Sequence, residues 1–142
     1  MRLDQIDLVC ADVAKSLAFY RLLGVDIPED KVWSTPSGPH HCEVDAGDGV
    51  SLAFSSVALA NVYNKGYRPA RGGASMIGFR VVERADVDNA YARLERAGHR
   101  GVQPPNDAFW GARFAIVEDP DGTHVAISSP SEAAHRSAGP EL

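Results

Sequence analysis

Residues 40–43 (HHCE) are the densest group of potential metal ligands in the chain. Imidazole, thiolate and carboxylate groups are the donors that zinc and related divalent ions prefer. In a strand, successive side chains point to opposite faces, so this group would divide into two separate pairs. The sequence offers no second pair at a recognised ligand spacing. We therefore expect no metal at this segment, and we expect His41 to give a ligand a polar contact, because imidazole can donate or accept.

Acid–base chemistry has three further candidates, Asp7, Arg80 and His124. A general acid or base must be positioned and must titrate near the working pH, which favours histidine. His124 is thus the candidate base, whereas Asp7 and Arg80 are expected to form a structural ion pair. The chain has no serine-nucleophile motif, glycine-rich phosphate loop or dinucleotide fingerprint, and Gly72 and Gly73 fit a linker turn. We assign no catalytic residue and expect no cofactor.

The 142 residues carry 14 Lys and Arg against 19 Asp and Glu, a net charge of −5. This balance argues against binding to a nucleic-acid backbone, and the longest uncharged run, residues 49–64, is shorter than a membrane span. No apolar segment typical of a signal peptide opens the sequence, so we expect a cytoplasmic protein. Cys10 and Cys42 are expected to be free thiols.

An internal repeat organises the elements that must position these residues. Residues 12–24 (DVAKSLAFYRLLG) match residues 86–98 (DVDNAYARLERAG), and residues 48–56 (DGVSLAFSS) match residues 121–129 (DGTHVAISS). The first pair predicts two helices that begin at Asp12 and Asp86 and end at Gly24 and Gly98. The second pair predicts a turn followed by a strand.

Further strands are expected near residues 32–34, 40–46, 101–103 and 112–118. Each half then has the order strand, helix, strand, strand, strand. We expect one domain in four segments: a first module over 1–56, an irregular linker over 57–73, a second module over 74–130, and a frayed polar tail over 131–142. Residues 103–111 are expected to form an irregular loop.

The opening LDQIDLVCADVAKSLAFYRLLG, the stretch WGARFAIVEDPDG and the duplicated βαβββ order together resemble the vicinal oxygen chelate superfamily. This group includes glyoxalase I, bleomycin-resistance proteins and extradiol dioxygenases. The resemblance implies an α+β fold in which two βαβββ modules form a curved, cup-shaped sheet that holds the ligand. It also implies a homodimer, with each cup built either within one chain or across two.

Enzymes of this superfamily typically bind a divalent metal through a histidine on the first strand and a glutamate on the last strand of each module. Matching the motifs to this chain puts the first-strand positions at Gln5 and Met76 and the last-strand positions at Ala53 and Ala126. Alanine has no donor atom, and one neutral glutamine oxygen cannot hold a metal. We therefore predict a metal-independent member of the group.

Strand alternation assigns small or polar residues to the concave face, including Ser51, Ser55 and Gly78. Protein interiors do not tolerate voids, so a ligand or inward-folded loop aromatics must fill such a face. Five aromatic residues lie outside the helix-packed pattern and could stack on a flat ligand. The predicted ligand-binding residues are Gln5, Asp7, Trp33, His41, Ser51, Ala53, Tyr63, Tyr67, Met76, Gly78, Phe109, Trp110, His124 and Ala126. Trp110 has a structural alternative, with Arg113 of the same motif pairing a carboxylate.

The leading hypothesis is a noncatalytic protein that sequesters a bulky, hydrophobic or aromatic natural product or antibiotic and thereby confers resistance to the drug. Its net negative charge favours a neutral or cationic ligand. The competing hypothesis is a lyase, isomerase or dioxygenase of the glyoxalase-like group with an atypical or absent metal site. Neither a nucleic acid nor a membrane is expected as a partner.

Overall fold

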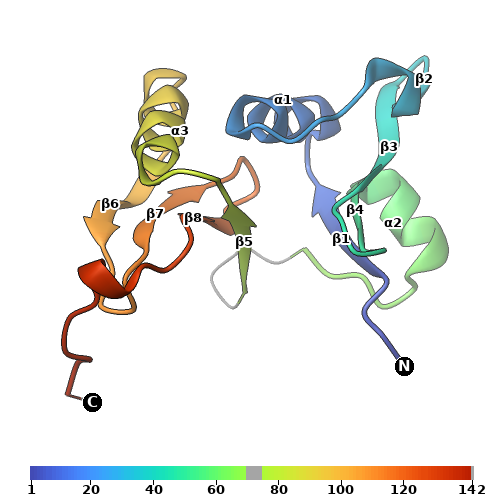
Figure 1. Ribbon diagram of the computed structural model, residues 1–142. Helices are drawn as coiled ribbons and strands as arrows, with labels where there is room; N and C mark the ends of the chain where they lie inside the picture. The colour runs from blue at the N-terminus through green and yellow to red at the C-terminus, as the bar shows by residue number, and fades with distance from the viewer. Residues whose placement is uncertain (70–74, 142) are drawn as a thin grey trace. The chain divides into compact units, whose positions relative to one another are not determined.

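Two four-stranded sheets with the same strand order make up the fold (Figure 1). A computed structural model describes residues 1–69 and 75–141, so the expected turn at Gly72 and Gly73 lies outside the described residues. The chain divides into two units, Met1–Ala70 and Arg71–Leu142. Each unit has a helix after its first strand and three strands after that helix, which confirms the predicted α+β class and the duplicated order.

In the first unit, the sheet order is β1-β4-β3-β2, with β1 parallel to β4 and the other neighbours antiparallel. Its elements are β1 (Gln5–Cys10), α1 (Val13–Leu23), a 3-10 turn (Glu29–Lys31), β2 (Trp33–Thr35), β3 (Gly38–Asp45), β4 (Ser51–Ser56) and α2 (Val57–Tyr63). Strand β1 lies at one edge of this sheet, and its register beside β4 aligns Gln5 with Ser51.

Helix α1 begins and ends where the sequence predicts. The Asp12 carboxylate accepts a hydrogen bond from the Lys15 backbone N–H at 3.1 Å, and Gly24 stops the helix with φ +120°, a conformation that suits glycine. The helix packs on β3 and β4, where the Tyr20 and Phe54 ring centroids lie 4.9 Å apart. Both rings are fully buried, so this contact forms the centre of the first core.

The segment expected to be an irregular linker instead begins with α2. Ser56 caps this helix by accepting a hydrogen bond from the Leu59 N–H at 3.1 Å, and Ala60 is fully buried. The helix packs against β1, β3 and β4 on the face opposite α1, as Figure 1 shows. One face of the first sheet is therefore covered by α1 and the other is partly covered by α2.

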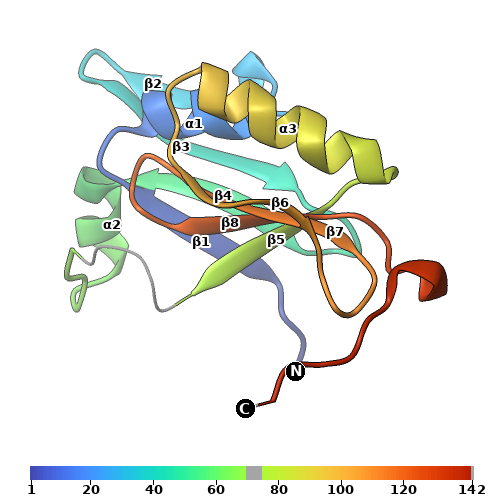
Figure 2. The ribbon, with the colours of Figure 1, turned by 90° about the vertical axis from the view of Figure 1, so that its left-hand side faces the viewer.

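The second unit repeats the pattern with the order β5-β8-β7-β6. Its elements are β5 (Met76–Arg80), α3 (Arg84–Arg96), β6 (Gly101–Asp107), β7 (Arg113–Glu118), β8 (His124–Ser128) and a 3-10 turn (Ala133–His135). Helix α3 packs on β6, β7 and β8 of its own sheet (Figure 2). The predicted N-cap at Asp86 is wrong, because the helix begins one turn earlier with Glu83 as its N-cap, and Asp86 accepts from the Glu83 backbone N–H at 2.9 Å.

Two further segments are more ordered than expected. Residues 103–107, expected as loop, continue strand β6, which lies at the edge of its sheet and pairs with β7 through shifted register. Part of the segment expected to be a frayed tail is attached to the second unit. Glu132 N donates to Gly111 O at 3.1 Å, and Ser137 N donates to Phe109 O at 3.0 Å. The backbones of Trp110 and Arg136 also form an isolated antiparallel β-bridge. The helices of the described residues are all too short or too polar to cross a membrane.

Gly111 is the residue on which this tail attachment depends. Its φ is +94°, and a Cβ at this position would meet the carbonyl oxygen of Glu132 and the side chain of Arg136. We expect Gly111→Ala to lower the free energy of unfolding by about 2 kcal/mol through backbone strain and displacement of the tail. Urea denaturation measures this loss. Gly139→Ala is the matched control, since a Cβ there only touches Phe109, and an equal loss in both variants would contradict the prediction.

Candidate functional site

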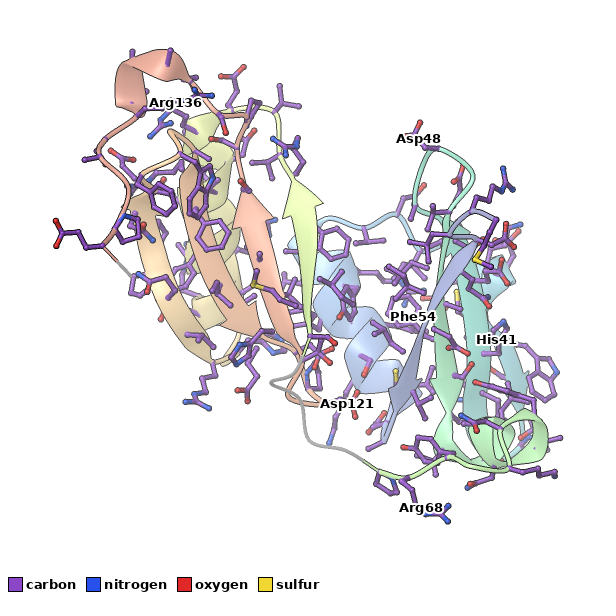
Figure 3. All side chains as sticks on the ribbon, turned by 90° about the horizontal axis from the view of Figure 1, so that it is seen from below. His41, Asp48, Phe54, Arg68, Asp121 and Arg136 are labelled. Atoms are coloured by element: carbon purple, nitrogen blue, oxygen red, sulfur yellow. The ribbon has the colours of Figure 1, made fainter. Side chains whose placement is uncertain are left out.

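A hollow of about 380 Å³ lies on the α2-bearing face of the first sheet. Its walls come from β1, β2, β3, β4 and α2, and are formed by Gln5, Asp7, Trp33, His41, Ser55, Leu59 and Tyr63. Five of these seven are predicted ligand-binding residues. Figure 3 shows His41 on this side of the sheet, while Phe54 lies on the side of α1.

Strand register explains why three polar side chains meet here. β1 runs beside β4 with Asp7 aligned to Ala53, and β3 runs beside β4 with His41 aligned to Ser55. Because alternate residues share a face, Asp7, Ser55 and His41 all project away from the α1 core. The hydroxyl of Tyr63, at the end of α2, reaches the same point.

These four side chains form a continuous hydrogen-bonded chain. Tyr63 Oη donates to Asp7 Oδ2 at 2.6 Å, and Ser55 Oγ donates to the same oxygen at 3.1 Å. The Ser55 Oγ atom also lies 3.2 Å from His41 Nδ1. Ser55 is fully buried, so its hydroxyl is shielded from water and its partners are these groups.

Burial of the Tyr63 hydroxyl, together with its hydrogen bond to Asp7, raises the pKa of that phenol above its ordinary value. The phenol therefore remains protonated at neutral pH and remains a donor to Asp7. Tyr63 is nevertheless 54% exposed as a residue, and Trp33 is 53% exposed. Two aromatic surfaces thus stay open beside a polar floor.

Gln5 and Glu43 extend this floor along the sheet. Gln5 Nε2 donates to Glu43 Oε2 at 3.2 Å. A second hollow next to the first is lined partly by His41, Glu43 and Ser51, which places the predicted residue Ser51 beside the site. Ala53 is fully buried in β4, and Tyr67 follows α2 in a turn and does not line the first hollow.

The other predicted ligand-binding residues belong to the second unit. Met76, Gly78, His124 and Ala126 lie on β5 and β8, where Met76 aligns with His124 and Gly78 with Ala126. Phe109 and Trp110 form an aromatic cluster of their own: the Trp110 ring lies 5.0 Å from that of Phe109 and 5.2 Å from that of Phe114. The structural alternative for Trp110 is thereby supported within this unit.

The family's metal positions can be compared by register. Gln5 aligns with Ser51 in the first sheet, and Met76 aligns with His124, the repeat equivalent of Ser51, in the second. The two first-strand positions are therefore equivalent, as are Ala53 and Ala126. Alanine methyl groups supply no metal ligand, so this set of side chains does not fit a divalent ion. Among the described residues, no three His, Cys, Asp or Glu side chains cluster as a metal site would require.

Ser55 and Leu59 line the hollow but are absent from the predicted site. Alternation alone assigns Ser55 to this face, yet a serine carries no signal of a hydrogen-bonded chain. Leu59 belongs to α2. The sequence signal for this helix was Ser56, a good N-cap residue, followed by a segment that contains Ala and Leu. His124 and Arg80 remain candidates for acid–base chemistry by residue type alone. The Arg80 guanidinium donates to Ser129 O at 3.3 Å.

The predicted pairing of Arg113 with a carboxylate is confirmed. Its guanidinium donates to both oxygens of Asp88, at 2.9 and 2.6 Å, and to Asp107 at 3.2 Å. The hydrogen bonds from Arg113 hold the pKa of Asp88 below its usual range. This network ties α3 to β6 and β7 and is structural.

The lowered pKa of Asp88 has a definite sign for stability. A carboxyl whose folded pKa is depressed stabilises the fold above its unfolded value, about 3.9, and this contribution is lost as pH falls through the folded pKa. We expect Arg113→Met to cost about 1 kcal/mol at pH 7 and to flatten the loss of stability below about pH 4. Denaturation from pH 2.5 to 7 tests this. Arg100→Met, which removes an exposed pair with Glu118, is the control, and an unchanged acid slope in Arg113→Met would contradict the assignment.

The fold and site together define a class: duplicated βαβββ proteins with a ligand-sized hollow on the sheet face away from the first helix. The model of the Glyoxalase/Bleomycin resistance protein/Dioxygenase superfamily matches residues 2–127. The chain belongs to this superfamily, as its motifs indicated. None of the curated proteins compared with the chain matches it.

Solved structures agree on the fold. A glyoxalase/bleomycin resistance protein/dioxygenase family enzyme from Burkholderia phytofirmans has a TM-score of 0.74 at 18% identity, over 91% of this chain and 98% of that one. A glyoxalase-related enzyme from Fulvimarina pelagi has a TM-score of 0.70 at 22% identity, over 91% and 88%. Lactoylglutathione lyase from Agrobacterium tumefaciens has a TM-score of 0.62 at 19% identity, over 90% and 92%. At these identities the likeness concerns the fold.

Proposed function

We propose that the protein is a metal-independent binding protein that holds a bulky aromatic compound, such as a natural product or antibiotic, against the first sheet. The observation that carries the proposal is the hollow in which exposed faces of Trp33 and Tyr63 border the polar group of Asp7 and His41. Ligand pockets typically combine aromatic walls with a few fixed polar groups. Aromatic rings also gain stacking energy beyond the area they bury.

Sequestration follows from mass action alone. A protein present at a concentration near that of a toxic compound lowers the free concentration once the dissociation constant is smaller than both. No reacting group or bound metal is needed for this activity. The proposal includes a homodimer, as the family resemblance implies, and a cytoplasmic location, and analytical ultracentrifugation would check the dimer.

The test is a fluorescence titration with a panel of aromatic antibiotics and polycyclic compounds, using the chain's own tryptophans. We expect saturable quenching by some members, with one site per chain by calorimetry. Elemental mass spectrometry after incubation with zinc, nickel, manganese and ferrous iron, followed by desalting, is expected to find far less than one metal per chain. A full metal equivalent, or no binding by any panel member, would overturn the proposal.

An enzyme of the glyoxalase-like group is the second candidate, favoured by the hydrogen-bonded chain that ends at His41. A histidine held in one orientation by a buried partner is suited to proton transfer. Turnover of a substrate that is lost in Asp7→Ala or His41→Ala, with binding retained, would establish this alternative. Absence of turnover in the unmodified protein would count against this alternative, and retained turnover in both variants would exclude the two residues from the reaction.

A further inference from the structure

Hydrogen-bond direction in the hollow determines which ring nitrogen of His41 carries the proton. An ionised carboxylate only accepts, so the Ser55 hydroxyl gives its one hydrogen to Asp7 Oδ2. The Ser55 oxygen can then only accept from His41 Nδ1, 3.2 Å away. Neutral His41 must therefore carry its proton on Nδ1 and expose an unprotonated Nε2.

Tyr63 reinforces this direction from the other side. It donates its own hydrogen to the same Asp7 oxygen at 2.6 Å, so it is not a donor to Ser55 or His41. The Tyr63 hydroxyl, the Ser55 hydroxyl and His41 Nδ1 thus each donate to another member of this hydrogen-bonded group. His41 Nε2 makes no hydrogen bond to any of the described residues, and His41 lines the hollow.

We propose that His41 Nε2 is the acceptor for a hydroxyl or N–H group of the bound aromatic compound, with Ser55 and Asp7 as positioning residues that fix the histidine tautomer. The proposal rests on the function proposed above and adds that the ligand carries a hydrogen-bond donor. A group that only accepts, such as an ether oxygen, would face a lone pair and leave Nε2 unpaired in the complex. An unpaired polar group in a desolvated site costs affinity, so the hollow discriminates by the presence of a donor.

Three probes with one ring system isolate this contact: 2-naphthol, 2-methoxynaphthalene and naphthalene. We expect 2-naphthol to bind about tenfold more tightly than either analogue, as measured by calorimetry and by amide shift changes in the first unit. In His41→Phe, which keeps a flat ring but removes the acceptor, this ratio is expected to fall to about one. Ser55→Ala frees Nδ1 and is expected to reduce the ratio with the aromatic walls unchanged.

The neighbouring histidine provides the matched control. His40 hydrogen-bonds Thr35, Ser37 and Ser56, and its ring lies 5.4 Å from that of Trp33. Because His40→Phe keeps this ring contact and leaves His41 unchanged, it should keep the tenfold ratio. Far-ultraviolet circular dichroism confirms that each variant is folded. Equal affinities for the three probes in the unmodified protein, a ratio that survives in His41→Phe, or no binding by all three would overturn this inference. Binding by other aromatic compounds would then still uphold the proposed function.

Discussion

Replacement of Phe54 by alanine is expected to lower the free energy of unfolding by about 3–5 kcal/mol. The ring is fully buried between β4 and α1, with its centroid 4.9 Å from that of Tyr20, which in turn lies 5.0 Å from that of Phe19. Its removal loses the transfer free energy of the ring and leaves a cavity that packed neighbours cannot fill. Guanidinium denaturation followed by circular dichroism measures the change.

Phe109→Ala is the matched control, because it makes the same chemical change at a side chain that is 44% exposed. We expect it to cost about 1 kcal/mol, mainly from contact with Trp110. Similar losses in both variants would show that the Phe54 site is not a core position. The cost of Phe54→Ala also bears on the candidate site, since Ser55 is the next residue along β4.

The repeat predicted the sheet elements well because each copy contains the same local signals. A helix N-cap, a helix-ending glycine and an Asp-Gly turn are set by residues adjacent in sequence. Helix α2 was missed because the repeat fails at that point: the first copy continues with Val57 after its two serines, whereas the second continues with Pro130. A helix of seven residues is not stable alone, so α2 depends on its Ser56 cap and on packing against the sheet.

Strand β6 was predicted too short for a different reason. Pro104 and Pro105 lack the backbone N–H that a central strand requires, so the pattern favoured a loop. The segment can remain a strand because, within the part of the chain that the structure describes, β6 is an edge strand whose one partner is β7, through a shifted register. Which strand lies at the edge is a property of the tertiary fold.

The sequence predicted on which side of the sheet the site residues lie, but it did not predict which of them contact one another. Alternation assigned Asp7, Ser51 and Ser55 to one side of the sheet, and this assignment needs only the strand positions. Within its own unit Asp7 accepts hydrogen bonds from Ser55 and Tyr63, and the expected pairing with Arg80, which would join the two units, stays a prediction. Those contacts depend on the register of β1 against β4 and on the position of α2, which local sequence does not specify.

Substitution of Trp33 is expected to give the largest loss of ligand binding. Trp33 is 53% exposed on β2 and forms one wall of the hollow, beside His41. An exposed aromatic wall gives much of the affinity in such a site, because stacking and desolvation act together. We therefore expect Trp33→Ala to weaken the tightest aromatic ligand by about tenfold to a hundredfold, measured by calorimetry.

The two tryptophans of the chain make the assignment testable by fluorescence. In Trp110→Phe only Trp33 emits, so ligand quenching should persist, whereas in Trp33→Phe it should largely disappear while weaker binding remains measurable by calorimetry. Trp110 is packed against Phe114 in the second unit and does not line the hollow. Undiminished affinity in Trp33→Ala, or quenching that follows Trp110 alone, would move the binding surface away from the first sheet. The loss in Trp33→Ala with quenching retained in Trp110→Phe would place the aromatic ligand over β2, because no change at the second unit could produce that combination.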